Sequence, residues 1–321
     1  MKKIDVTALG ELLIDFIETK KSEQNNRLFE ANPGGAPCNV LAMLNKLGDS
    51  TAIIGKVGKD SLGLELKERV TSLGIDTKYL YLDEITPTTL AFVSKLPNGD
   101  RDFSFYRNPG ADMMLVEEEV KEEQFEKSKI FHFGTLSMTN DGIKKATIKA
   151  LEFAKKQQCL ISFDPNLREP LWDDLKDAKD ATHLGLSYTD ILKISDNEIR
   201  WLSGYQDLDQ GIKWLRQQYD ISLIVLSCGA DGSKAYYKDI TVEQAAFLSK
   251  ETIETTGAGD TFGGCVLHFV LKYGIESLNE MNLQEMLLFA NAAASIITKR
   301  KGALMVMPEK SEIEELIYGK K

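Results

Sequence analysis

The chain has 321 residues, of which 43% are hydrophobic and 27% are charged, and its formal net charge at pH 7 is −10. These values are typical of a folded globular protein, and the length suits one large α/β domain or two average ones. The acidic balance argues against nucleic acid or an anionic membrane as the main partner, because phosphate-rich surfaces attract clustered lysine and arginine. A small anionic ligand is not excluded, since it responds to the local charge of its site.

The N-terminal stretch does not resemble a signal peptide, because Asp5, Glu11 and Asp15 interrupt its apolar residues. No apolar run approaches the roughly 20 residues of a membrane span. The cysteines are far apart and form no C-x-x-C pair: Cys38, Cys159, Cys228 and Cys265. Most of them have small or apolar neighbours, which is typical of buried thiols in a reducing compartment. We therefore expect a cytoplasmic protein.

Short apolar runs alternate with amphipathic stretches along the chain. The expected strands are residues 4–9, 50–57, 130–133, 160–163, 191–194 and 223–226. The expected helices are residues 40–47, 62–73, 143–156 and 210–219. This alternation predicts βαβ units, and hence an α/β fold in which helices flank both faces of a mostly parallel central sheet. Ligands of such sheets bind beyond the carboxyl ends of the strands.

Two segments depart from this alternation. Residues 12–33 have strand-like composition but no crossover helix. Residues 88–107 read as a hairpin with an Asn-Gly turn at residues 97–100. Together they predict either a small separate sheet, serving as a lid or a dimer interface, or a simple surface excursion.

The segment TTGAGD at residues 255–260 is the most informative in the chain. We expect a β-rich approach up to Thr256 and a helix over the apolar run 262–271. A turn of small residues that leads into a helix leaves N–H groups unpaired at the positive end of the helix dipole, which is an anion site. Asp260 beside it is either a base acting next to a phosphate or an ordinary helix N-cap.

Further polar residues follow other expected elements. Gly34 and Gly35 let the backbone approach a ligand, and Asn39 in the following helical turn suits a sugar hydroxyl; the alternative is an ordinary Gly-Gly turn. Asp15 lies in an apolar run and either accepts hydrogen bonds from a ligand or faces solvent. Asn166 and Arg168 follow a strand, where an arginine can neutralise a phosphate or simply lie on the surface.

Two more clusters follow the strands at 191–194 and 223–226. Glu198 either holds Mg²⁺ through water or completes a capping box opened by Ser195. Ser227, Gly229 and Gly232 form either a surface for a planar base or a tight turn. Jointly, these clusters place polar groups at several strand ends, as a single site requires.

The chain resembles the PfkB/ribokinase family of sugar kinases over essentially its full length. The residues that carry the resemblance are GGAPCNVLAMLNKLG at 34–48 and TTGAGDTFGGC at 255–265. Within the family it is most similar to bacterial fructokinases, on the segments FYRNPGAD at 105–112, FDPNLREPLW at 163–172 and KISDNE at 193–198. The resemblance implies one ribokinase-like three-layer domain over residues 1–321, with lid segments at about 12–33 and 88–107.

The resemblance implies ATP-dependent phosphorylation of a primary sugar hydroxyl, with fructose as the expected sugar and fructose 6-phosphate as product. Asp260 matches the catalytic base, and the anion hole matches Gly257, Ala258 and Gly259. Arg168 is expected to assist the transfer. The positions expected to hold the sugar are Asp15, Gly34, Gly35, Asn39, Arg107, Asn166 and Asp260.

The resemblance also implies a nucleotide and cations. The positions expected to contact ATP are Lys193, Ser195, Ser227, Gly229, Gly232, Gly257, Gly259 and Asn291. Glu198 matches the glutamate that organises Mg²⁺ through water. A K⁺ site would involve Glu254, Thr256, Ile297 and Gly302. Relatives usually have Asp at the position of Glu254, and the extra methylene moves the carboxylate by roughly a bond length, which puts K⁺ activation in question.

The expected partners are therefore a sugar and ATP, with a homodimer formed through the lid. One alternative is a kinase for 2-keto-3-deoxygluconate or a similar sugar, whose acid group would need a cation such as Arg107. The other alternative is a sugar- and nucleotide-binding regulator without catalysis, although the retained Asp260 and its glycine turn argue against it.

Overall fold

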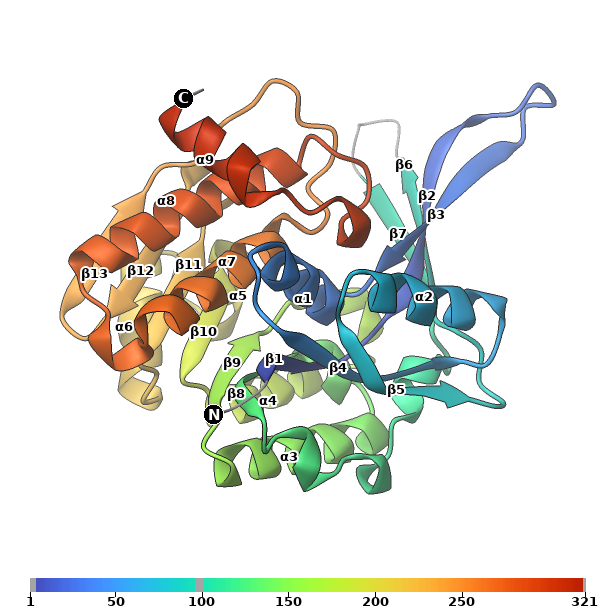
Figure 1. Cartoon of the computed structure of the whole chain (residues 1–321), viewed down its shortest axis with the longest axis horizontal. Helices are drawn as coiled ribbons and strands as arrows, with labels where there is room; N and C mark the ends of the chain where they lie inside the picture. Colours follow the sequence, from blue (N-terminus) through green and yellow to red (C-terminus); the bar gives the residue numbers. More distant parts are fainter. Residues whose placement is uncertain (1–3, 96–100, 320–321) are drawn as a thin grey trace.

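The computed structural model describes residues 4–95 and 101–319, and its two β-sheets lie side by side (Figure 1). The central sheet has nine strands. In spatial order they are β13 (Ile240–Gln244), β12 (Ser233–Tyr237), β11 (Leu223–Ser227), β10 (Ile191–Ser195), β9 (Leu160–Asp164), β8 (Ser128–Gly134), β1 (Ile4–Leu9), β4 (Thr51–Gly58) and β5 (Asp76–Asp83). All neighbours pair in parallel except β11 with β12 and β12 with β13. The predicted mostly parallel sheet is confirmed.

Helices cover both faces of the central sheet. One face packs against α1 (Ala36–Lys46), α2 (Ser61–Ser72), α7 (Ala258–Tyr273) and α8 (Glu280–Ile297). The other packs against α3 (Asp141–Lys156), α4 (Leu175–Leu186), α5 (Asp196–Ser203) and α6 (Leu208–Gln218). The final helix, α9 (Lys310–Tyr318), lies beside α8. Strands covered on both faces read as continuous apolar runs, which is why most of them were predictable.

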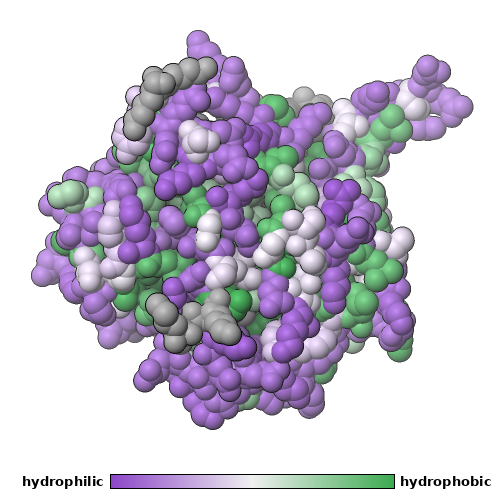
Figure 2. Space-filling model, viewed as in Figure 1, coloured by the Kyte–Doolittle hydropathy of each residue, from purple (hydrophilic) through white to green (hydrophobic). Residues whose placement is uncertain are grey.

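The two departing segments form a small sheet of four strands. Its order is β3 (Arg27–Gly34), β2 (Leu13–Lys21), β6 (Leu90–Lys95) and β7 (Arg101–Tyr106). The predicted separate sheet is therefore confirmed, whereas the expected Asn-Gly turn lies outside the described residues. The β2–β3 hairpin projects from the body; its tip is hydrophilic, and hydrophobic side chains gather at its base (Figures 1 and 2).

Helices α1 and α7 pack unusually close together. A Cβ atom at Gly264 would lie 2.8 Å from the Cβ of Met43, so the glycine is what permits this approach. The contact brings the starts of the two helices together at the carboxyl ends of the central strands. No helix within residues 4–95 and 101–319 is long and apolar enough to cross a membrane.

Candidate active site

One face of the central sheet changes from apolar to polar at its carboxyl edge. Beneath α1 and α7, Ile130 and Ile191 belong to the hydrophobic core. Two residues further along the same strands and face stand His132 and Lys193. Asp164, at the end of β9, lies between them and pairs with Lys193. Strand alternation thus delivers polar groups to a single edge, as the strand-end rule predicts.

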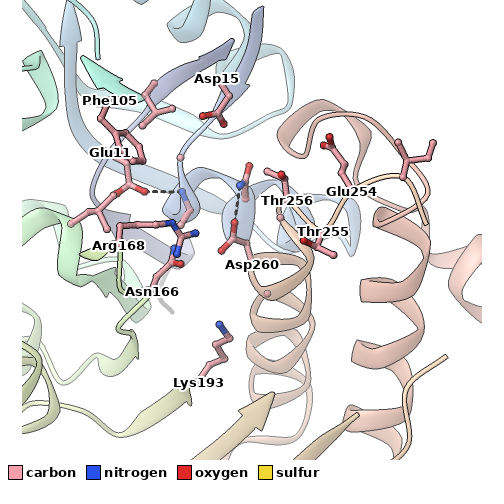
Figure 3. A pocket seen from close by; sticks show the side chains of 18 of the residues that line it. Glu11, Asp15, Phe105, Asn166, Arg168, Lys193, Glu254, Thr255, Thr256 and Asp260 are labelled. Atoms are coloured by element: carbon pink, nitrogen blue, oxygen red, sulfur yellow. Dashed lines mark hydrogen bonds between the residues drawn. The ribbon is translucent and has the colours of Figure 1, made fainter. Parts of the chain in front are cut away.

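A cavity of about 660 Å³ opens at this edge (Figure 3). It is bounded by the small sheet on one side and by the start of α7 on the other. Many of the predicted site residues line it: Asp15, Gly35, Asn39, Asn166, Arg168, Lys193, Glu254, Thr256, Gly257, Gly259 and Asp260. A second cavity of about 420 Å³ adjoins it. Both cavities are lined by Asn166, Arg168, Lys193 and Gly259, so they meet at the first turn of α7.

Asp260 is the third residue of α7 rather than its cap. The N-cap is Gly257, whose φ of 76° lies in the left-handed region that favours glycine, and no side chain caps the helix. The N-cap interpretation of Asp260 is therefore wrong. The expected β-rich approach is also wrong: the segment is irregular, and the N–H groups of Ile253 and Glu254 donate to the Thr298 carbonyl.

The Asp260 carboxylate is buried and held by one side chain. Asn39 Nδ2 donates a hydrogen bond of 2.7 Å to Asp260 Oδ2. Burial raises the pKa of Asp260 above its ordinary value, while that hydrogen bond and the charges of Lys193 and Arg168 oppose the rise. The Asn39 Oδ1 atom is buried and, among the described residues, has no hydrogen-bond partner. An unpaired buried acceptor at a cavity wall suits a ligand hydroxyl.

Asp15 faces the cavity from β2 (Figure 3), so the solvent-facing alternative is wrong. Burial raises its pKa to about 7, although the positive charge of Arg168 opposes the rise. Close approach explains the neighbouring glycines: a Cβ at Gly34 would lie 2.1 Å from Asp15 Oδ2. A Cβ at Gly35, whose φ is 124°, would lie 2.3 Å from the Glu11 carbonyl oxygen. Both positions therefore exclude a side chain.

Glu11 is a site residue that the sequence reasoning missed. It is 4% exposed and lines the larger cavity, and its Oε1 accepts a 2.8 Å hydrogen bond from the Ala36 N–H at the start of α1. Burial raises its pKa to about 7. The signal was present in the sequence, because Glu11 follows the strand 4–9 and so stands at a carboxyl end.

Arg168 lines both cavities, and Asn166 beside it has a φ of 45°. The Asn166 N–H donates to Asp164 Oδ1 at 3.2 Å, which fixes the turn after β9. Asp164 was not among the predicted site residues. Burial raises its pKa to about 7, with Lys193 opposing the rise.

The second cavity is lined by Ser195, Glu198, Ser227 and Gly229. The capping box is present: Ser195 Oγ accepts from the Glu198 N–H, and Glu198 Oε2 accepts from the Ser195 N–H at 2.8 Å. Glu198 Oε1 also accepts from the Leu167 N–H at 2.8 Å. The carboxylate therefore joins α5 to the loop of Arg168 while facing the cavity. Within the described residues, no group of three or more His, Cys, Asp and Glu side chains forms a metal cluster.

Two predicted nucleotide positions, Gly232 and Asn291, line neither cavity. Asn291 Nδ2 donates to the carbonyl oxygens of Gln244 and Ala245, at 3.1 and 3.2 Å. Gly232 has a φ of 97°, and a Cβ there would lie 2.1 Å from the Gln244 carbonyl oxygen. In this structure, both residues instead organise the end of β13.

Arg107 does not line the cavity, contrary to expectation. Its guanidinium is buried and pairs with Asp112 at 2.7 Å, and it also donates to Thr139 Oγ1 and the Leu136 carbonyl. These partners occupy all three nitrogens, because the arginine directly follows β7 and its side chain is turned into the body. Its neighbour Phe105 lines the cavity instead.

Two of the predicted K⁺ residues, Glu254 and Gly302, are joined by a hydrogen bond. Glu254 is buried, and its Oε1 accepts a 2.8 Å hydrogen bond from the Gly302 N–H. Ile297 is buried near the end of α8, and Thr256 lines the cavity. The carboxylate thus ties the loop before α7 to the loop after α8.

Comparison with known proteins identifies the family of this chain. The model of the pfkB family carbohydrate kinases matches residues 3–310. The chain belongs to the pfkB family of carbohydrate kinases. It is 34% identical over 314 residues to fructokinase-1 of Zea mays, covering 97% of both sequences.

The solved structures of pfkB carbohydrate kinases include close matches to this fold. The ATP-bound fructokinase of Xylella fastidiosa superposes with a TM-score of 0.90 at 29% identity, covering 99% of this chain and 98% of that one. A double mutant of the Vibrio cholerae O395 fructokinase, bound to fructose, ADP and potassium ion, gives 0.88 at 25% identity and 99% coverage of both chains. The ribokinase-like interpretation of the fold is therefore confirmed.

Proposed function

We propose that this pfkB family member is a fructokinase that transfers the γ-phosphoryl group of ATP to a primary hydroxyl of fructose, giving fructose 6-phosphate. The observation that carries the proposal is the position of Asp260, buried at the point where two cavities meet the first turn of α7. A plant fructokinase that is similar in sequence and a bacterial fructokinase that is similar in structure support the same reaction. The larger cavity would hold the sugar, and the adjoining one the nucleotide.

The chemistry follows from this arrangement. The oxygen of the sugar hydroxyl bonds to the γ-phosphorus, and Asp260 accepts the proton of that hydroxyl. At the same time the bond from the phosphorus to the β,γ-bridging oxygen breaks, and ADP leaves. The N–H groups at the start of α7 face the phosphoryl oxygens and offset their charge. Phosphoryl transfer needs mainly positioning and charge neutralisation. Arg168, which lines both cavities, suits that task.

The cavity favours an uncharged sugar over a sugar acid. Four carboxyl groups line it, those of Glu11, Asp15, Glu254 and Asp260. Arg107, the cation suggested for a sugar acid, is locked into its pair with Asp112, and the cations that do line the cavity, Arg168 and Lys193, lie at its junction with the second cavity. Carboxyl groups and the free Oδ1 of Asn39 instead suit sugar hydroxyls. This argues against 2-keto-3-deoxygluconate as substrate.

The second cavity supports a nucleotide and Mg²⁺. Ser195, Ser227 and Gly229 line it and are the residues that we propose to contact ATP. Glu198 faces it with a carboxylate fixed by three hydrogen bonds and suits an ion that retains most of its waters. When bound, Mg²⁺ would neutralise phosphate charge. Gly232 and Asn291 support this cavity through the end of β13 rather than by lining it.

We also propose a K⁺ site beside Glu254, Thr256, Ile297 and Gly302. The connected loops around α7 support it, as does the potassium ion of the Vibrio cholerae relative. A comparison of turnover in K⁺ with turnover in tetramethylammonium tests this site. Equal rates in the two salts would contradict it.

We propose that two copies of the chain associate through the outer face of the small sheet. Asp15 and Phe105 face the cavity, so alternation turns Phe16 and Tyr106 outward. Phe16 stacks on Phe92 with ring centroids 4.9 Å apart, and Tyr106 contacts Phe92 edge-on at 5.3 Å. Tyr106 is 64% exposed. Phe16 and Phe92 are half-buried, and an aromatic cluster with one exposed ring is typical of an interface.

The four free cysteines are consistent with a cytoplasmic setting, which we also propose.

An ATP-consumption assay across a panel of neutral sugars and sugar acids tests the function. Fructose should give the highest kcat/KM. If kcat/KM is highest with 2-keto-3-deoxygluconate, that sugar acid is the substrate instead of fructose. No turnover with any sugar would favour a regulator that binds without catalysis.

A further inference from the structure

Lys193 lies at the junction of the two cavities and lines both. Its side chain is 12% exposed, and its Nζ atom lies 2.9 Å from Asp164 Oδ2 and 3.2 Å from Asp164 Oδ1. It points from β10 toward the space below Asp260 (Figure 3).

The ammonium group lies against the first turn of α7. A Cβ atom added to Gly259 would lie 3.1 Å from Lys193 Nζ, which is tighter than most packing contacts, so the ammonium would have to move by a few tenths of an ångström. Gly259 is the second residue of the helix and has no positive φ, so its backbone conformation does not require glycine. A side chain at this position would therefore press on the lysine ammonium.

Two positive groups thus stand together: the ammonium of Lys193 and the amino end of α7. Burial by itself would lower the pKa of Lys193, but the charges of Asp164 and Glu198 more than offset this, and the pKa is raised. The lysine is therefore charged. An anion placed between the ammonium and the helix end would be attracted by both, and this position lies where the sugar cavity meets the nucleotide cavity.

We propose that Lys193 is a further catalytic residue, whose ammonium group contacts an oxygen of the phosphoryl group while that group passes from ATP to the sugar, and that Asp164 is the positioning residue that holds it. The inference rests on the proposed function. As the sugar oxygen bonds to phosphorus and the bond to ADP breaks, the hydroxyl proton passes to Asp260 and the leaving charge to ADP. Lys193 transfers no proton; it is a fixed charge that offsets the charge on the phosphoryl oxygens.

The alternative is that Lys193 merely holds the nucleotide. Loss of the lysine would then weaken the binding of ADP, which carries no γ-phosphoryl group. If Lys193 acts on the group in transfer, its loss lowers kcat and leaves ADP affinity nearly intact. The kcat and the ADP dissociation constant therefore separate the two roles.

The decisive experiment compares Lys193→Met with wild type for kcat with fructose and ATP, and for ADP affinity by calorimetry. We expect kcat to fall about 10²- to 10³-fold, as for removal of one preorganised donor, with ADP affinity within about threefold. Asp164→Asn should lower kcat less, with the KM for ATP unchanged.

Lys56→Met is the matched control, because Lys56 is also a buried lysine of the central sheet, paired with Glu119 at 2.7 Å, and lines neither cavity. Its kcat should equal that of wild type.

Gly259→Ala gives a second measurement should Lys193→Met fold poorly. The added methyl group displaces the ammonium, so kcat should fall in the wild-type background and change little in the Lys193→Met background. The inference is overturned if Lys193→Met keeps kcat within about threefold of wild type, or if ADP affinity falls as much as kcat. A wild-type protein without turnover on any sugar overturns the proposed function as well, so the two failures are distinguishable.

Discussion

Asn39 Nδ2 donates a 2.7 Å hydrogen bond to Asp260 Oδ2 across 221 positions of sequence. The bond joins the first turns of α1 and α7, and Gly264 allows these helices to approach closely enough to form it. The two segments that carry the family resemblance, residues 34–48 and 255–265, therefore meet at the Asp260 carboxylate. Asn39 opposes the burial-driven rise in the pKa of Asp260.

Asn39→Ala should move the acid limb of the kcat profile to higher pH. A base must be ionised to act, and loss of the hydrogen bond lets burial raise the pKa of Asp260 further. A hydrogen bond to a charged group contributes about 1.5–3 kcal/mol, so we expect a shift of about one pH unit or more. The measurement is kcat with saturating fructose against pH. An unmoved limb, or one moved to lower pH, would contradict the role of Asn39.

Glu11→Gln should reduce the loss of stability on going from acid to neutral pH. Glu11 has its pKa raised by burial from 4.5 to about 7. Between these values the folded state retains a proton that the unfolded chain releases, so stability falls as pH rises. Asp15 and Asp164, also raised to about 7, act in the same direction, and some slope should remain. Urea unfolding at about pH 5 and about pH 7.5 gives the change in the free energy of unfolding for wild type and for the variant. The same change in both proteins would refute the raised pKa of Glu11.

Arg107→Met should destabilise the fold without raising the KM for fructose. The arginine is 7% exposed and its partner Asp112 is 4% exposed, so removing one charge leaves the other buried and unpaired. Such a change costs about 3–5 kcal/mol. Denaturant unfolding and steady-state kinetics check the two halves of the prediction. The double variant Arg107→Met/Asp112→Leu should recover part of the stability. A stable Arg107→Met variant with a raised KM for fructose would contradict this prediction and show that Arg107 acts in the sugar site.

Tyr106→Asp should shift a dimer to monomer. The change places a charge at the most exposed ring of the outer aromatic cluster of the small sheet, against Phe92. Tyr318→Asp is the matched control, because Tyr318 is similarly exposed, 65% against 64%, and lies on α9. Light scattering after size exclusion gives the mass of each variant. A monomeric wild type, or the same shift in both variants, would contradict the interface.

The sequence predicted most of the parallel strands because these are apolar runs covered on both faces. It missed β5 and β13, which form the two edges of the sheet, and β12, which lies beside β13. Edge strands such as β5 mix buried and exposed residues and leave a weaker signal. Helix α8 was missed because it is apolar on most of its surface and shows little periodicity.

The candidate site was predictable where residue type and local pattern coincide: Asp260 follows the glycine turn that begins α7, and Arg168 follows the end of β9. Arg107 was misplaced because its position gives no sign of Asp112, the buried carboxylate five residues on that turns it inward. Asn291 and Gly232 line neither cavity, because their partners are backbone atoms at the end of β13. Such long-range pairing is not encoded in a local pattern.

The most direct test of the account is the rate at which Asp260→Asn forms fructose 6-phosphate from fructose and ATP, beside wild type. The amide keeps the shape of the side chain but cannot accept the hydroxyl proton, so we predict a kcat lower by about 10²- to 10⁴-fold with an unchanged unfolding midpoint. A variant that turns over at nearly the wild-type rate would contradict the central claim that Asp260 is the base.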